Sequence, residues 1–226
     1  MILRIMGVNQ DIKIDDRIST KLVILNKQLF RIIDSILSLN EISDDNELLL
    51  VINDEMKRLK DRVICVIDFF HYDDIFKSMM SCVLKEIDQM VVTSPSIKEE
   101  FEQISSSFKA FIDKIIIDYE FEIEAQKKPK LSSFLKAYGY YLVVENESNI
   151  LVKFYSLIDM FTSFYSERLL VFINISSIFE EKELEEIKKY LLYKKNHFLF
   201  IESTNVDILK TDNMYEIDSD FVLFNT

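Results

Sequence analysis

The stretch ERLLVFINI, residues 167–175, decides the fold because it is an apolar run that predicts a buried strand. A short turn separates it from FEEKELEEIKKYL, residues 179–191, whose acidic start and apolar spacing predict a helix. A second apolar strand follows at residues 197–202. Strand, helix and strand in this order predict a right-handed parallel βαβ unit, from which nucleotide-binding α/β proteins are built.

Glycine is the residue that a nucleotide-binding unit needs and that this sequence nearly lacks. The two glycines are Gly7 and Gly139, and neither lies between a strand and a helix with the spacing of a phosphate-binding loop. We therefore predict an α/β fold whose main part is a P-loop-like α/β head without a phosphate loop. Such a head indicates a binding protein and not an enzyme.

The composition favours a cytoplasmic protein. Hydrophobic residues make up 49% of the 226 residues and charged residues 29%, which suits an apolar core with a polar surface. The longest apolar run is far shorter than the ~20 residues of a membrane-spanning helix, and the N-terminus lacks the features of a secretory signal. We expect no membrane partner. The net charge of −12 repels nucleic acid on average, so a nucleic-acid site must be a local basic patch.

Changes in periodicity divide the chain into three predicted segments. Residues 1–72 form the first part of the head, and residues 118–226 form the second part. Residues 73–117 between them carry apolar side chains every three or four positions, with a break at Ser94-Pro95-Ser96. This pattern predicts an inserted helical-hairpin arm.

The expected elements of the head follow from alternation, apolar runs and caps. Strands are expected at residues 2–5, 11–14, 21–24, 47–52, 63–69, 118–124, 140–144, 214–218 and 221–224. Helices are expected at residues 26–39, 131–138 and 149–166, and a charged connection at residues 53–62.

This order of elements resembles the ring-forming adaptation protein of type II-A CRISPR systems. The likeness rests on the C-terminal third and is extended by two upstream stretches. It is carried by residues 169–174, 183–186, 198–202 and 217–221, and upstream by residues 118–122 and 135–139. The resemblance covers nearly the whole chain.

The resemblance implies a function that composition and periodicity do not give. It implies a non-catalytic protein that assembles as a homotetrameric ring, binds double-stranded DNA ends without sequence preference and binds calcium. It also implies a role in spacer acquisition, with other CRISPR adaptation proteins and the effector nuclease as partners.

One row of carboxylates is a candidate metal site. Alternation along residues 118–124 would place Asp118, Glu120, Glu122 and Glu124 on one face of a strand. Four carboxylates in a row repel one another unless a cation lies nearby, and calcium prefers several hard oxygen ligands in loose geometry. The alternative is a solvated strand face, balanced by nearby lysines.

Two basic clusters are candidates for DNA contact. The first is Lys57, Arg58, Lys60 and Arg62, and the second is Lys127, Lys128 and Lys130. Lysine and arginine bind phosphates by neutralising charge, without base contacts. The alternative for each cluster is ordinary solvated surface charge. The phenylalanines and tyrosines are interpreted as core, because nothing in their pattern indicates a base-stacking platform.

Two other functions remain open from the sequence. One is a degenerate P-loop ATPase-like regulatory subunit, against which the missing Gly-rich loop argues. The other is a purely structural interaction module that docks through the helical arm. Molecular mass in solution and duplex binding would separate that module from a DNA-binding ring.

Overall fold

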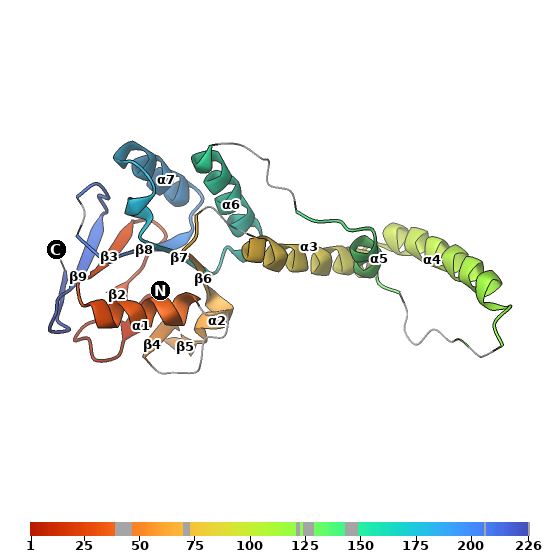
Figure 1. The fold of residues 1–226 in the computed structure, drawn as a ribbon, viewed down its shortest axis with the longest axis horizontal. Coiled ribbons are helices and arrows are strands. Elements are labelled where there is room, and N and C mark those ends of the chain that lie inside the picture. Colours follow the sequence, from red (N-terminus) through yellow and green to blue (C-terminus); the bar gives the residue numbers. More distant parts are fainter. Residues whose placement is uncertain are drawn as a thin grey trace. The chain divides into compact units, whose positions relative to one another are not determined.

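The computed structural model describes residues 1–38, 47–69, 73–120, 123, 129–142, 149–205 and 207–225. It forms two compact units (Figure 1). Unit 1 comprises Met1–His71 and Glu145–Thr226, and unit 2 comprises Tyr72–Val144. The sequence placed the end of the arm at residue 117, whereas unit 2 also includes the helix α5 (Leu131–Ala137), which packs on helix α3 (Asp73–Thr93). In the described ranges, no helix combines the length and apolarity needed to span a bilayer.

A six-stranded sheet organises unit 1. Its strands lie in the order β10-β9-β3-β8-β7-β6, and each neighbouring pair is parallel except β10 with β9. The strands are β3 (Thr20–Ile24), β6 (Val63–Val66), β7 (Leu169–Ile173), β8 (His197–Glu202), β9 (Asn213–Ile217) and β10 (Leu223–Asn225). The predicted closing hairpin is confirmed as β9 and β10.

The βαβ unit predicted from the opening stretch is confirmed. Strand β7 runs parallel to β8, with Leu169 opposite His197, and helix α7 (Glu181–Tyr193) connects them. A capping box begins α7: the Glu180 side chain accepts the N–H of Glu183, and the Glu183 carboxylate accepts the N–H of Glu180 at 2.9 Å. The acidic start of the helix therefore stabilises its N-terminus.

A second, antiparallel sheet has the order β2-β1-β4-β5. Its strands are β1 (Ile2–Ile5), β2 (Ile12–Lys13), β4 (Leu48–Ile52) and β5 (Glu55–Lys57). The sequence predicted only a charged connection at 53–62. Instead, Asn53 and Asp54 adopt positive φ angles of 51° and 62° and form a tight hairpin turn between β4 and β5, as these residue types favour. Helix α2 (Leu59–Arg62) follows.

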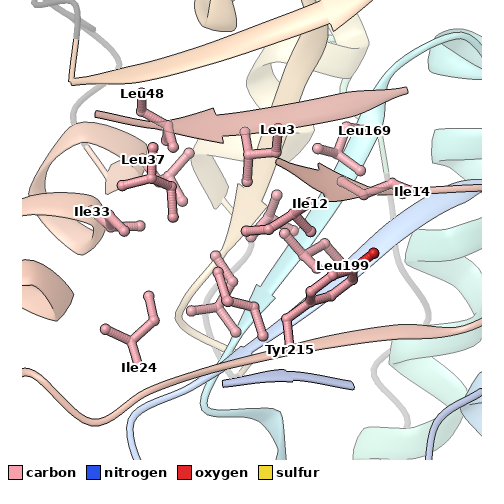
Figure 2. Packing of buried hydrophobic residues seen from close by; sticks show 14 of the residues in the cluster. Leu3, Ile12, Ile14, Ile24, Ile33, Leu37, Leu48, Leu169, Leu199 and Tyr215 are labelled. Carbon is pink, nitrogen blue, oxygen red and sulfur yellow. The ribbon is translucent and has the colours of Figure 1, made fainter. Parts of the chain in front are cut away.

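The main core lies between the two sheets and helix α1 (Lys27–Ser38). Figure 2 shows Leu3 and Leu48 of the small sheet and Leu199 of the large sheet in this core, with Leu48 beside Leu37 of α1. Asn26 caps α1 as predicted, because its side-chain oxygen accepts the N–H groups of Gln28 and Leu29, each at 3.0 Å. Burial of this apolar surface is the main force that holds unit 1 together.

Helix α6 (Ile150–Tyr165) and α7 contribute buried side chains to the opposite side of the large sheet. The ring centroid of Phe154 in α6 lies 5.3 Å from that of Phe172 in β7 and 5.4 Å from that of Phe179. Leu184, Ile187 and Leu191 of α7 are also buried. The large sheet is therefore covered on both faces, as is typical of parallel sheets.

Unit 2 consists of α3, α4 (Pro95–Ile116) and α5. Ser94 alone separates α3 from α4, with Pro95 in the first turn as predicted. Figure 1 shows α4 continuing beyond the end of α3. The predicted helical hairpin is therefore wrong, because a single linking residue does not reverse the chain. The two helices follow one another.

Two contacts attach α5 to the long helices. Asp88 of α3 accepts the N–H of Ser132 at 3.0 Å and its hydroxyl at 2.7 Å. The ring of Phe134 contacts Phe101 and Phe108 of α4, with centroids 5.8 and 5.5 Å apart. Gly139, at a φ of 73°, ends α5, and the N–H of Tyr140 bonds the Leu135 carbonyl as in a Schellman motif.

Two predicted strands near α5 are corrected. In the expected strand 118–124, the described residues 118–120 and 123 are in turn or irregular conformation, and the N–H of Tyr119 bonds the Ile116 carbonyl. In the expected strand 140–144, the described residues 140–142 are irregular too. Alternation alone does not make a strand, because a strand also needs a neighbour to accept its backbone hydrogen bonds. The remaining positions of both stretches lie outside the described residues.

Candidate nucleic-acid interface

The first basic cluster lies on β5 and α2 of unit 1. Lys57 pairs with Glu55, and the Arg62 guanidinium lies 3.0 Å from the Glu167 carboxylate. Arg58 and Lys60 are exposed, and no carboxylate pairs with either among the described residues. Two of the four predicted cations thus have carboxylate partners, and among the described residues Arg58 and Lys60 do not.

The second basic cluster is described only in part. Lys130 is exposed at the N-terminal cap of α5, and Lys127 and Lys128 lie outside the described residues. Partial burial by itself would raise the pKa of Asp88. The hydrogen bonds from Ser132 and the charges of Lys130 and Lys136 together have a larger effect, so the pKa of Asp88 lies below its usual value. Lys130 belongs to unit 2, so the two clusters are on separate units.

The acidic row is also described in part. Asp118 and Glu120 are exposed in the turn that follows α4, while Glu122 and Glu124 lie outside the described residues. Within the described ranges, no three potential metal ligands come together. The two described side chains are carboxylates with hard oxygen donors, which fits calcium in chemical type.

Sequence reasoning missed a polar cluster at the carboxyl ends of β7 and β8, the edge where open α/β sheets bind ligands. Asn174 has a φ of 52°, and its side-chain oxygen accepts the N–H of Ser203 at 2.9 Å. Glu202, only 2% exposed, accepts the N–H of Ser176 at 3.1 Å. Polar residues at the end of an apolar run look like ordinary strand ends, so nothing in the sequence marked this cluster.

A buried lysine shares this environment. Lys21 of β3 is 4% exposed, and its ammonium donates to the Leu209 carbonyl at 2.9 Å. Burial lowers the pKa of Lys21, against the attraction of Glu202 and other carboxylates. Burial likewise raises the pKa of Glu202, and the hydrogen bonds from Ser176 and the charge of Lys21 offset this only in part. Lys21 and Glu202 thus bond to other groups of the protein, and they present no open site for a phosphate.

The turn from β3 to α1 has the place of a phosphate loop but not its length. The turn consists of Leu25 and Asn26, without glycine, and the side-chain oxygen of Asn26 is used to cap α1. A phosphate loop needs about eight residues whose N–H groups point at the phosphates. The turn is too short for that cradle.

Helix α4 carries an apolar stripe that the described part of unit 2 leaves largely exposed, although Phe134 of α5 contacts Phe108 within it. The helix has no buried residue. Ile104, Phe108, Phe111 and Ile115, spaced along one face, are exposed by 60%, 50%, 58% and 48%. Exposed stripes of this length are typical of interaction surfaces.

Three tyrosines around Gly139 were interpreted as core and are not. Tyr138, Tyr140 and Tyr141 are 80%, 62% and 76% exposed. The expected strand 140–144 would have buried one face, whereas the described residues 140–142 are irregular and leave Tyr140 and Tyr141 at the surface.

Comparisons with known proteins give a consistent result. The model of the family described as CRISPR-associated protein (Cas_Csn2) matches residues 42–221. CRISPR-associated protein Csn2 of Enterococcus faecalis is 21% identical to this chain over 180 residues, which are 79% of this chain and 80% of that relative. The crystal structure of Stu0660 of Streptococcus thermophilus matches with a TM-score of 0.57 and 17% identity, covering 96% of this chain and 75% of that one. The structural match shows a shared fold.

Proposed function

This chain belongs to the family of CRISPR-associated Csn2 proteins, and we propose that it is a non-catalytic protein that binds double-stranded DNA ends during spacer acquisition. In this proposal it works as a homotetrameric ring in the cytoplasm, with other adaptation proteins and the effector nuclease as partners. Its parallel-sheet unit is a P-loop-like scaffold that has no phosphate loop, and so it binds DNA without hydrolysing nucleotides.

The observation that carries the proposal is the pair Arg58 and Lys60. Both are exposed and have no carboxylate partner among the described residues, in a chain with a net charge of −12. Phosphate contact by such groups needs no base-reading side chains, so it is independent of DNA sequence. Lys130 supports a second contact from unit 2, and the exposed stripe of α4 supports assembly into a ring.

Linear duplex DNA is expected to bind more tightly than a closed circle of the same sequence, because a ring is loaded only from an end. The affinity for the linear form is expected to fall steeply as salt is added, since counterions are released on binding. Fluorescence anisotropy or gel retardation with one plasmid, closed and linearised, measures this. Equal affinity for both forms would contradict loading from ends.

A matched pair of variants separates local contact from overall charge. Arg58→Ala with Lys60→Ala is expected to weaken binding and make the salt dependence shallower by about two phosphate contacts. Lys182→Ala with Lys189→Ala removes the same charge from exposed positions on α7 and is the control. If both double variants lose affinity equally, Arg58 and Lys60 make no special contact.

We propose calcium as the cofactor, bound through Asp118, Glu120, Glu122 and Glu124. The chemistry it supplies is neutralisation of carboxylates that otherwise repel one another. Saturating calcium, roughly a hundredfold above its Kd, is expected to stabilise the native protein by about 2.7 kcal/mol, because only that state binds it. Magnesium is expected to stabilise less, since it demands tight octahedral geometry. Melting curves with calcium, with magnesium and with chelator measure the difference.

Isosteric variants test the residues of this site. Asp118→Asn with Glu120→Gln is expected to remove the calcium-dependent rise in melting temperature. Glu99→Gln with Glu102→Gln, two exposed positions on α4, is expected to retain it. A calcium effect that survives in the first variant would place the ion elsewhere, and identical melting with and without calcium would leave the acidic row as a solvated surface.

A further inference from the structure

Unit 2 contains a pocket of about 460 Å³ between α3, α5 and the segment that follows Gly139. This volume lies within the roughly 300–1,000 Å³ that is usual for small-ligand sites. None of the residues assigned above to DNA or calcium lines the pocket.

One wall of the pocket is apolar and held in place. It consists of Phe76, Met80 and Leu84, which recur every four residues and so share one face of α3. Leu84 is 6% exposed. The hydrogen bonds from Ser132 to Asp88 fix α5 against the next turn of α3, so the pocket has a defined shape.

Two tyrosines also line the pocket. The Schellman turn at Gly139 ends α5 and leads the chain into Tyr140 and Tyr141, which both line the pocket. They are 62% and 76% exposed, so most of each ring is open to contact from solvent. Exposed aromatic rings beside an apolar wall are the usual platform on which unpaired bases stack.

The pocket is basic in an acidic protein. Its charged lining residues are Lys77 and Lys136, both exposed, and no carboxylate is among the residues that line it. The whole chain has a net charge of −12. A ligand of this pocket is therefore selected for negative charge together with a flat apolar face.

We propose that this pocket holds an unpaired terminal nucleotide of a DNA end. The base stacks on Tyr140 and Tyr141 over the apolar wall of α3, and its phosphate is neutralised by Lys77 and Lys136. The inference rests on the proposed DNA-end binding and adds to it a preference for ends that carry a single-stranded tail. No base-reading set of donors and acceptors lines the pocket, so the tail is bound regardless of its sequence.

The test compares three labelled duplexes by fluorescence anisotropy: a blunt duplex, the same duplex with a short unpaired tail, and that duplex with an abasic tail. The tail is expected to increase affinity by roughly tenfold over the blunt end, the size of one base–aromatic contact. The abasic tail is expected to give a much smaller increase, because it keeps the phosphates and loses the stacking.

Variants of the lining residues test whether the preference for an unpaired tail comes from the pocket. Tyr140→Leu with Tyr141→Leu is expected to abolish the tail preference and leave blunt-end affinity unchanged. Tyr138→Leu, an equally exposed tyrosine outside the pocket lining, is the matched control and is expected to retain it. Lys77→Gln with Lys136→Gln is expected to reduce the preference and its salt dependence.

The outcomes separate this inference from the function on which it rests. Normal blunt-end binding without a tail preference, or a preference that the Tyr140 and Tyr141 variants keep, overturns the inference alone. The pocket would then suit an acidic, apolar segment of a partner protein better than a nucleotide. Failure of the wild-type protein to bind any of the duplexes overturns the proposed function and the inference together.

Discussion

Replacing Lys21 by methionine is expected to lower the free energy of unfolding by about 3–5 kcal/mol at neutral pH. Lys21 and Glu202 are both almost fully buried, and each raises the stability of the other's charged form. Without the lysine, the carboxylate of Glu202 keeps its hydrogen bonds from Ser176 but has lost its buried counter-charge. Urea unfolding followed by circular dichroism measures the loss.

The loss is expected to depend on pH in a definite direction. The pKa of Glu202 is higher in the folded protein than in the unfolded chain, so the native state binds the proton more tightly. Stability from this group is therefore greatest below the unfolded pKa and falls as pH rises through the window between the two values. Removing Lys21 raises the folded pKa further, so the variant loses most at neutral pH and least in acid.

Two further variants separate the loss of the buried counter-charge from other effects of removing a lysine. Lys21→Met combined with Glu202→Gln is expected to regain part of the loss, because it removes the unpaired charge. Lys182→Met, at an exposed position of α7, is the control for loss of a lysine. A loss in Lys21→Met that is the same at every pH would mean that only the bond to the Leu209 carbonyl matters.

Charges on the apolar stripe of α4 are expected to dissociate the assembly. If the protein forms the proposed tetramer, Phe111→Glu with Ile115→Glu is expected to reduce the mass in solution from that of the tetramer to that of single 26.8 kDa chains. Burial of each such side chain between subunits contributes about 1.5–3 kcal/mol, and a buried glutamate reverses that gain. Size-exclusion chromatography with light scattering measures the mass.

A loss of assembly in the Phe111 and Ile115 variant must be distinguished from a loss of its fold. Helix α4 has no buried residue, so the substitutions are expected to leave its helical circular dichroism unchanged. Ser106→Glu with Ala110→Glu places the same charge on the opposite face of α4 and is expected to leave the mass unchanged. An unchanged mass in the Phe111 and Ile115 variant would exclude the stripe from the subunit interface.

The sequence predicted the parts of the fold that depend on contacts close along the chain. The apolar run of β7, the acidic start of α7 and the helix that begins after Asn26 each depend on a few neighbouring residues, and each is present as predicted. The α4 stripe shows the limit of periodicity. Spacing identified the apolar face, but it could not show that α4 continues from α3 and leaves most of this face exposed.

The candidate sites were less predictable because they depend on distant partners. Arg62 is neutralised by Glu167, 105 positions away, whereas Arg58 has no such partner among the described residues. The sequence presents the two arginines as equivalent. The alternation at residues 118–124 likewise predicted a strand face for the carboxylates, and the described part of that stretch is a turn.

The short turn between β3 and α1 has a consequence for the evolution of this chain. Single substitutions at Leu25 or Asn26 cannot produce a nucleotide-binding loop, because the motif needs several more residues than the turn contains. An insertion long enough to supply them would displace Asn26, whose side chain caps α1 and donates to the Ser219 carbonyl at 3.0 Å. Loss of these hydrogen bonds is expected to lower the stability of unit 1. Small changes to the present turn therefore do not lead to nucleotide binding.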